Sequence, residues 1–573
     1  MSIRAAQSAA LSSLQASQSG IAVASNNIAN ASVEGYTAKT QSLATNTQAG
    51  STTGVNVTAT GSSVDKYLLK SISGSATDSG YADVFTDPLT TVSSAFGTVG
   101  DDDSLSTMIT ELETSLATLA SNASSTSQKS LVLADAENIS NNLNTLSETV
   151  QSERGNADQK IDETVEQVNN LLYQIQSYNE QLTGLDASTA AASELNDARN
   201  QAINDLSELV NISYFTDSKN QTQVYLGGTQ LVGSQVHELS YTPSGAVNAD
   251  TTFGDITVNG KAVTSSIDGG TLGGLIDLRD ETLPAIQDQL DNMAVTLMDS
   301  VNAITNMGTA YPGADELTSS QDVAAGDAIS GTGTVRLVAT NDNGDAAEIL
   351  DIDLSTISTV QDLVDTINAS STLTATLNDD GTMTIAAASD DVNVAIINMD
   401  ASVGADEQGF SDYFGFNDMF IGTSAADMSL NSAWSDNSSL LPTGSGSSDS
   451  TLAVGDNVIA VASDDVASSL SALFDENLSF GAAGAMGATS SSLSNYAAEL
   501  LSDVARQTSE AQTNADVADA AYSDLVESFS NQYGVNLDEE ALTLTNLESA
   551  YSAAASVIDI TKSMMDTLLQ MVQ

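Results

Sequence analysis

The sequence of 573 residues has no cysteine, one histidine, one tryptophan and only 14 lysine and arginine residues. Without cysteine it can form neither disulfides nor thiolate metal sites, and the redox compartment stays undetermined. The one histidine is His237, and Tyr241 stands where a zinc-protease helix would need its second histidine. We therefore expect His237 to be a surface or core residue without a catalytic role.

Basic residues are outnumbered by 76 aspartates and glutamates, which gives a formal net charge of −62. Such an excess of negative charge makes nucleic acids and anionic membrane surfaces poor partners. No run approaches 18 consecutive apolar residues, so the sequence predicts no insertion into a membrane. The first 30 residues lack the continuous apolar core of a cleaved signal peptide, because Ser and Gln interrupt the apolar pairs.

Motifs for catalysis or ion binding are also scarce. Neither GxSxG nor GxxxxGK occurs. The acidic clusters at residues 101–103 and 341–345 could offer oxygen ligands to calcium, but they lack the glycine and distal glutamate of a helix-loop-helix calcium site. The carboxylates at 538–540 follow Asn536, a pattern that favours a capped helix start over a metal site. We expect no enzyme, no cofactor and no metal site.

What the sequence does contain is a regular spacing near both ends, with alternating steps of four and three residues. This heptad series is typical of helices that pack lengthwise. The N-terminal series is Ile3, Gln7, Ala10, Leu14, Ser17, Ile21, Ala24 and Ile28, and the C-terminal series is Leu547, Tyr551, Ala554, Ile558, Thr561, Met565, Leu568 and Val572. Polar members, and Gly20 beside the series, argue against a stable N-terminal helix in isolation.

We predict that the two terminal helices pack against each other. The alternative is two amphipathic helices that pack separately on a globular body. The residues predicted to form the assembly interface are Ile3, Leu14, Ile21, Ile28, Leu547, Tyr551, Ile558, Met565, Leu568 and Val572.

The N-terminal series ends in the stretch ASNNIANASVEGYTAKT, residues 24–40. Asn26, Asn27 and Asn30 favour turns and helix ends, and Gly35 tolerates backbone angles that other residues resist. Together with Tyr36 they form a predicted hinge, where the first helix stops and the chain crosses to another layer.

Helical periodicity also marks residues 129–182, with a weak point near Gly155, and residues 193–210, 273–305 and 491–532. Residues 40–61 are rich in Thr, Ser and Gly and are expected to be extended. Residues 311–450 differ, because GTVRLVAT and ATLNDDGTMTIAA alternate like strands around the short helix TVQDLVDTINAS. That region carries 23 acidic side chains and a single basic one, Arg336.

The predicted fold is mainly α with a β-rich inserted domain, in a nested arrangement. Residues 1–40 and 533–573 form a terminal helical domain of coiled-coil helices. Residues 41–310 and 451–532 form a long helical rod domain with short strands, and residues 311–450 form an acidic α+β domain at its tip. Aromatic residues of this insert could bind carbohydrate, although a core role is favoured: Tyr413, Phe414, Phe416 and Trp434.

Two terminal stretches resemble elements of the rod, hook and hook-associated proteins of the bacterial flagellum. They are SNNIANASVEGYT at residues 25–37 and GVNLDEEALTLTNLESAYSAAASVI at residues 534–558. Two internal segments, ELNDARNQAINDLSELVNIS at 194–213 and GGTLGGLIDLRDETLPAIQDQLDNMA at 269–294, look like those of proteins from the hook–filament junction. Ala38 and residues 544–547 depart from the family pattern.

The resemblance implies a structural, extracellular subunit of the flagellum, exported by the flagellar type III apparatus without a cleaved signal peptide. It implies terminal helices that are disordered in the monomer and order on assembly. The implied partners are the hook protein, hook-associated protein 3, further copies of the chain in a ring, and an export chaperone on residues 547–572. The alternatives are a hook or filament subunit, and an adhesin or enzyme function carried by residues 311–450.

Overall fold

The structure is a computed structural model that describes residues 3–48, 51–98, 100–101, 104–389 and 391–572. Helices account for about 53% of the chain, which confirms a mainly α fold with a β-containing domain. The chain divides into two compact units. Unit 1 comprises Met1–Pro88, Arg154–Asp280 and Ser509–Gln573, and unit 2 comprises Leu89–Glu153 and Glu281–Thr508.

Unit 1 contains the terminal helices, a helical layer and three small antiparallel sheets, ordered β1-β2, β3-β4-β5 and β6-β7-β8. Its helices are α1 (Ile3–Ala29), α2 (Lys66–Asp83), α6 (Ala190–Leu209), α7 (Gly270–Asp277), α14 (Leu537–Val572), and the parts of α5 (Thr126–Leu182) and α13 (Leu493–Tyr533) that fall in its segments. Its strands are β1 (Thr40–Gln48), β2 (Ser51–Gly61), β3 (Ser213–Thr216), β4 (Thr222–Leu226), β5 (Thr229–Val232), β6 (Leu239–Ser240), β7 (Thr257–Val258) and β8 (Lys261–Ala262).

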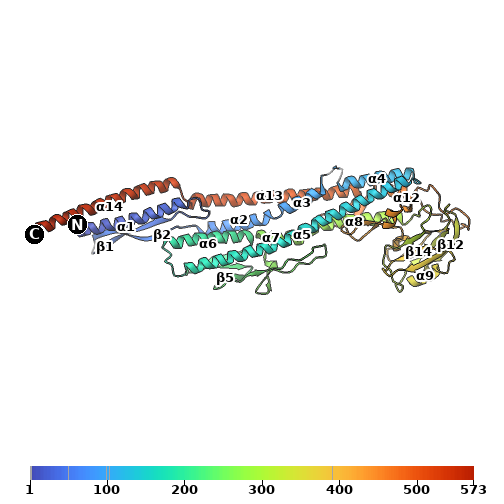
Figure 1. Cartoon of the computed structure of the whole chain (residues 1–573), viewed down its shortest axis with the longest axis horizontal. Coiled ribbons are helices and arrows are strands. Elements are labelled where there is room, and N and C mark those ends of the chain that lie inside the picture. The colour runs from blue at the N-terminus through green and yellow to red at the C-terminus, as the bar shows by residue number, and fades with distance from the viewer. Residues whose placement is uncertain (1–2, 49–50, 99, 102–103, 390, 573) are drawn as a thin grey trace. The chain divides into compact units, whose positions relative to one another are not determined.

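Helix α1 packs along α14 and against the β1-β2 hairpin. In Figure 1 the two helices lie side by side, with the N-terminal helix in blue and the C-terminal helix in red. The hairpin is joined to α1 by a hydrogen bond from the Val55 backbone N–H to Ser12 Oγ, 3.1 Å long. Asn536 accepts from the backbone N–H groups of Asp538 and Glu539 at 3.1 and 3.4 Å, which confirms its predicted role at the start of α14.

Two asparagines on α5 attach the small sheets to this helix. The Asn169 side chain donates to Leu239 O at 2.8 Å and accepts from Leu239 N at 2.9 Å. The Asn179 side chain makes the same pair of bonds with Thr222, at 2.8 and 2.9 Å. Because an amide side chain has both a donor and an acceptor, each asparagine completes the hydrogen bonding of one buried or half-buried strand residue.

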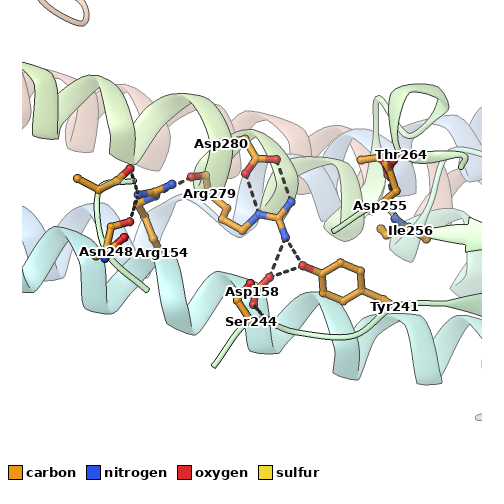
Figure 2. Close-up of polar contacts among 11 residues, drawn as sticks. Arg154, Asp158, Tyr241, Ser244, Asn248, Asp255, Ile256, Thr264, Arg279 and Asp280 are labelled. Atoms are coloured by element: carbon orange, nitrogen blue, oxygen red, sulfur yellow. Dashed lines mark hydrogen bonds and ion pairs between the residues drawn. The ribbon is translucent and has the colours of Figure 1, made fainter. Parts of the chain in front are cut away.

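The largest fully buried side chain of unit 1 is Arg279, which is 2% exposed. It lies in a π-helical turn, η2 (Leu278–Thr282), which follows α7. Figure 2 shows its guanidinium between Asp280 on one side and Asp158 of α5 with Tyr241 on the other. Its hydrogen bonds to Asp158 and Tyr241 are 2.8 and 2.6 Å long. Arg154, one turn from Asp158, donates to the Arg279 carbonyl at 3.1 Å, so both arginines join η2 to α5.

Burial lowers the pKa of Arg279, but the hydrogen bonds and charge of Asp280, together with the hydrogen bond to Asp158, outweigh it and hold that pKa above its ordinary value. Burial and the hydrogen bond to Asp158 raise the pKa of the Tyr241 hydroxyl. The arginine therefore stays charged inside unit 1, where its charge is balanced by carboxylates on both sides.

Unit 2 consists of helices and the β-rich insert. Its helices are α3 (Thr86–Phe96, of which the first residues belong to unit 1), α4 (Leu105–Ser121), the first part of α5, α8 (Leu283–Thr305), α9 (Val360–Ile367), α10 (Phe410–Phe414), α11 (Ser432–Asp436), α12 (Asp465–Leu473) and the start of α13. Its strands are β9 (Glu316–Thr318), β10 (Gly331–Thr332), β11 (Thr334–Thr340), β12 (Ala346–Asp353), β13 (Leu373–Leu377), β14 (Met383–Ala387), β15 (Asn393–Ile397), β16 (Ser402–Val403), β17 (Phe420–Ile421), β18 (Ser429–Leu430), β19 (Leu478–Phe480) and β20 (Thr489–Ser491).

The insert is built on two three-stranded antiparallel sheets, ordered β12-β11-β15 and β13-β14-β9. Strand β11 alternates as its sequence predicts, because Val335 and Leu337 face one hydrophobic cluster while Val338 faces another. Helix α9 begins with a capping box between Thr359 and Asp362 and covers the first cluster. The turn between β13 and β14 spans residues 378–382, where the sequence predicts a hairpin.

The four aromatic residues considered for carbohydrate binding belong to the interior of unit 2. Phe414, Phe416 and Trp434 are buried, and Tyr413 packs against the same cluster as Phe414. The burial of Phe414, Phe416 and Trp434, with Tyr413 half-buried, agrees with the core role favoured for these residues.

Several elements differ from the sequence expectations. Helix α5 runs through Gly155 as one helix of 57 residues, so the expected weak point is not seen. The helix expected over 273–305 is interrupted by η2 before Pro284, which lies in the first turn of α8. Helices α2, α3 and α4 are not predicted at all. Ser, Thr and Gly weaken the apolar period of α2, but α4 has a regular series of buried residues at steps of four and three, namely Leu105, Ile109, Leu112, Leu116 and Leu119.

We expect Arg279→Met to lower the free energy of unfolding of unit 1 by about 3–5 kcal/mol, because it leaves the buried Asp158 charge without its partner. Arg506→Met is the control, since the Arg506 side chain is 50% exposed and its ion pair with Asp503 should contribute about 0–1 kcal/mol. Urea denaturation followed by circular dichroism measures both variants. Equal unfolding midpoints for the two variants would contradict the expectation.

Candidate assembly site at the terminal helices

The contact between α1 and α14 is made largely by small side chains on α1. The residues that α1 buries are Ala10, Ala16, Ser17, Gly20, Ala24 and Asn27. On α14 the buried residues are Ala554 and Thr561. A Cβ atom added at Gly20 would lie 2.9 and 3.0 Å from the two methyl groups of Leu547. The two helices therefore approach closely at Gly20, where a larger residue would displace the Leu547 side chain.

Most of the residues predicted for the assembly interface are half-buried in the structure. Those that are half-buried are Ile3, Leu14, Ile21, Ile28, Leu547, Tyr551, Ile558 and Met565. Leu568 is exposed, and the side chain of Val572 lies outside those that the structure describes. The C-terminal end of α14 is thus less covered than its middle.

A second face of α14 is apolar and exposed. Val557, Ile560, Met564, Leu568 and Met571 are between 41% and 77% exposed, and they follow one another at steps of three or four residues. This spacing aligns them along one stripe of the helix. Contiguous exposed apolar surface of this kind marks an interaction site, because water contact is costly for each side chain.

One buried amide links the end of α1 to both α14 and the hinge. Asn27 is fully buried, and its Nδ2 donates to Glu540 Oε1 at 2.7 Å and to Lys39 O at 2.9 Å. Its Oδ1 accepts from the Lys39 backbone N–H at 3.0 Å and from the Tyr36 hydroxyl at 3.1 Å. All four hydrogen-bonding positions of this amide are therefore used, which an aspartate or leucine could not reproduce.

The hinge is also fixed to α6. Asp197 of α6 accepts hydrogen bonds from the backbone N–H and the hydroxyl of Thr37, at 3.0 and 2.8 Å, and forms a buried ion pair with Lys39. The Lys39 ammonium also donates to Thr37 O at 2.8 Å and lies 4.0 Å from the centre of the Tyr36 ring. Burial, followed by the charge of Glu194, raises the pKa of the Tyr36 hydroxyl, so it stays a hydrogen-bond donor.

The remaining hinge residues shape the turn. Asn30 donates from its side chain to Asn26 O at 2.9 Å, and its backbone N–H bonds the same carbonyl at 3.0 Å. Gly35 has φ +71°, and a Cβ there would lie 2.5 Å from Gln201 Oε1. The positive backbone angle favours glycine at this position, whereas the Gln201 side chain is flexible and could move away from an added Cβ.

Three residues of this network are not predicted as site residues from the sequence: Lys39, Asp197 and Glu540. The hydrogen bond between Asn27 and Glu540 joins residues 513 positions apart, and the ion pair of Lys39 joins it to a residue 158 positions away. The only signal for Asp197 is its place in the family-like stretch ELNDARNQ. No local pattern reveals which distant carboxylate a lysine will meet.

A group of carboxylates lies near the hinge. Burial raises the pKa of Asp205, and the charge of Glu34 adds to that effect. Burial also raises the pKa of Glu208, and the charges of Asp205 and Asp83 contribute. In the part of the chain that the structure describes, no three His, Asp or Glu residues are grouped to hold a metal ion.

Comparison with known families gives two matches. Residues 89–317 match the model for the flagellar hook-associated protein FlgK helical domain, and residues 8–37 match the model for the flagella basal body rod protein. The second match includes the Asn27 hinge. Over the described residues, no helix is both long and apolar enough to cross a membrane.

Curated relatives and a solved structure agree with these matches. Flagellar hook-associated protein 1 of Escherichia coli K12 is 27% identical over 312 residues, covering 51% of this chain and 55% of that protein. The protein of the same name from Bacillus subtilis 168 is 26% identical over 344 residues, covering 52% of this chain and 66% of that protein. The chain therefore spans about half to two thirds of the length of these relatives.

The solved structure is that of the flagellar hook junction protein FlgK from Burkholderia pseudomallei. It aligns over 80% of this chain and 98% of that chain, with a TM-score of 0.50 and 16% sequence identity. At this identity the match shows a shared fold. Residues 89–317 are thus similar to the helical domain of a flagellar hook-associated protein, and residues 8–37 to a flagellar rod protein. Over about half of its length the chain is similar to flagellar hook-associated protein 1.

The close approach of α1 and α14 at Gly20 can be tested by comparing an alanine substitution there with one at a glycine that has free space around it. Gly74→Ala, in α2, should stabilise the protein by up to about 1 kcal/mol, because alanine favours a helix and its Cβ meets no atom within 4 Å. Gly20→Ala should lose this gain or reverse it, because its Cβ pushes against Leu547. Urea midpoints report the difference, and an equal gain in both variants would contradict close packing at Gly20.

The raised carboxyl pKa values predict a pH dependence. Asp205 binds a proton more readily in the folded chain than in the unfolded chain, so its destabilising effect at neutral pH is relieved as the pH falls toward its folded pKa. We expect Asp205→Asn to raise the unfolding midpoint at pH 7 and to have less effect at pH 4.5 to 5. Hydrogen bonds from Ser188 lower the pKa of Asp186, so Asp186→Asn should have the opposite sign. Thermal melts at several pH values test both, and parallel pH profiles would contradict the assignment.

Proposed function

We propose that this chain is a structural subunit of the bacterial flagellum that joins hook to filament by polymerising through its terminal helices. The observation that carries this proposal is the exposed apolar stripe of α14, which lies on a helix already packed against α1. A helix pair with one covered and one uncovered apolar face is suited to bind further helices of the same kind. The relatives named above support the location at the junction between hook and filament.

The physical basis is burial of α14 side chains between neighbouring copies. Full burial of a valine, isoleucine or methionine contributes about 1.5–3 kcal/mol relative to exposure. Ordering a segment on binding costs about 2–5 kcal/mol or more, so several such residues are needed to offset it. The stripe at residues 557–571 supplies five.

The buried network around Asn27 supports a fixed direction for the terminal helices. It ties the end of α1 to the start of α14 through Glu540 and ties the hinge to α6 through Asp197. Under this proposal, residues 1–40 and 533–573 act as the polymerising domain. Residues 41–310 with 451–532 act as the rod domain, and residues 311–450 act as the domain inserted at the tip of that rod.

The proposed partners follow from this role. They are further copies of the chain in a ring, the hook protein on one side and hook-associated protein 3 on the other. An export chaperone is proposed to bind residues 547–572 before assembly, because that segment carries the exposed apolar side chains. The proposed location is extracellular, after export through the flagellar type III apparatus without a cleaved signal peptide.

The alternative roles have less support. A hook or filament subunit would agree with the rod-protein match at residues 8–37, but the match to a hook-associated helical domain at 89–317 favours the junction. An adhesin or enzyme function of residues 311–450 has no observation in its favour, since the candidate aromatic residues are in the core. We propose a structural role without catalysis.

The test is complementation of a strain that lacks this chain. We expect the triple variant Val557→Ser, Ile560→Ser, Met564→Ser to fold as a monomer, because all three side chains are exposed, yet to release filament protein into the medium. Val517→Ser, which changes an exposed valine on α13, is the control and should restore filaments. Electron microscopy of the cells and analysis of the medium measure the outcome. Normal filaments with the triple variant would refute assembly through this stripe.

A further inference from the structure

Lys66 and Lys70 are the closest pair of basic residues in the sequence. They lie one turn apart on α2, at the i and i+4 positions where like charges destabilise a helix by a few tenths of a kcal/mol. Acidic residues outnumber basic ones by 76 to 14, yet among the described residues neither lysine is in an ion pair. The pair therefore gives the start of α2 a local positive charge.

Both lysines line a cavity of about 620 Å³ within unit 1. The cavity lies between α2, α6 and β3, and Arg199 of α6 contributes to its wall. Burial lowers the pKa of Arg199 to about 10, which leaves the guanidinium charged at neutral pH. Three of the 14 basic side chains of the chain thus line one cavity.

The carboxylates nearby are already engaged elsewhere. Asp197, which also lines the cavity, is bound to Lys39 and Thr37. Asp217 accepts hydrogen bonds from the backbone N–H groups of Lys219 and Gln221, at 2.8 and 3.0 Å. The side chain of Asp65 caps α2 by accepting from the Tyr67 backbone N–H. Among the residues that line the cavity, the three basic side chains face one carboxylate, Asp197, so the lining has a net positive charge.

Exposed aromatic rings accompany this charge. Tyr67 is 84% exposed and Phe215 is 52% exposed, and both line the cavity. Aromatic residues make up only 5% of the chain, and the rings of the insert cluster are buried. Cationic side chains beside exposed rings suit a peptide segment that has carboxylates and some apolar atoms, whereas an inorganic anion would gain nothing from the rings.

We propose that this cavity binds a carboxylate-bearing segment of a second copy of the chain. The inference rests on the proposed function in one respect, since that function places copies side by side. Copies with a net charge of −62 repel one another, so their contact requires local positive charge facing carboxylates of the neighbour. The lysine pair and Arg199 supply that charge at a place where the chain's own carboxylates are engaged.

Carbodiimide cross-linking tests this contact directly. The reagent activates a carboxylate, and a lysine amine in contact with it displaces the urea product to form an amide. Purified full-length chain, half of it labelled with ¹⁵N, is treated at low ionic strength and digested for mass spectrometry. Amides that join a labelled to an unlabelled peptide arise between two copies. We expect Lys66 and Lys70 to form them several-fold more often than other exposed lysines.

Lys160 and Lys261 are the matched controls, because both are exposed lysines of the same unit. The double variant Lys66→Ser, Lys70→Ser should weaken self-association in sedimentation velocity, while Lys160→Ser, Lys261→Ser, with the same net charge, should not. Raising the salt to about 1 M, where screening acts within about 3 Å, should reduce the wild-type association. Equal cross-linking at all four lysines, or amides only within single copies, would overturn the proposal.

This result is separable from the flagellar role. Suppose that Lys66 and Lys70 form amides between labelled and unlabelled copies while the α14 triple variant still builds filaments. The proposed contact between copies is then supported, and assembly through α14 is refuted. If instead the triple variant blocks filaments and these lysines form no amides between copies, the flagellar role is supported and the cavity proposal is refuted.

Discussion

The terminal helices depend on one buried side-chain amide. Asn27 lies where α1 ends, and its four hydrogen bonds reach the hinge at Tyr36 and Lys39 and the first turn of α14 at Glu540. A buried polar group is stabilising only when its partners are in place, so the geometry of all three segments is coupled. The ion pair between Lys39 and Asp197 extends this coupling to α6.

The pair of helices α1 and α14 has two kinds of apolar surface. On one side, small residues of α1 allow close contact with α14, as at Gly20 and Leu547. On the other side, large apolar residues of α14 remain exposed. The first surface determines how the two helices of one chain pack, and the second leaves apolar area that only another molecule can cover. A charge of −62 makes such contact depend on where positive charge is placed.

The heptad spacing was sufficient to predict α1, α14 and most of α5, since long regular periods are strong signals. Gly20 could be noticed in the sequence only as a weakness beside that spacing, whereas the structure makes it the point of closest approach. Helix α2 was not predicted because Ser, Thr and Gly dilute its apolar face. Helix α4 was predictable, since Leu105, Ile109, Leu112, Leu116 and Leu119 follow the same spacing of four and three as the terminal helices. The pairs Asn27–Glu540, Lys39–Asp197 and Arg279–Asp158 could not be predicted, because each partner lies far away in the sequence.

Unit 1 is assembled from three segments separated by long stretches of chain, and unit 2 from two. In unit 1, the contacts between α1 and α14 join residues more than 500 positions apart, as in the hydrogen bond between Asn27 and Glu540. Closing loops of this length has an entropic cost that must be met before the contacts can stabilise the fold, which makes high contact order a cause of slow folding. The helix pair can therefore be completed only after residues 537–572 are available. In kinetic terms, the chain carries a built-in delay between its synthesis and the formation of its terminal domain.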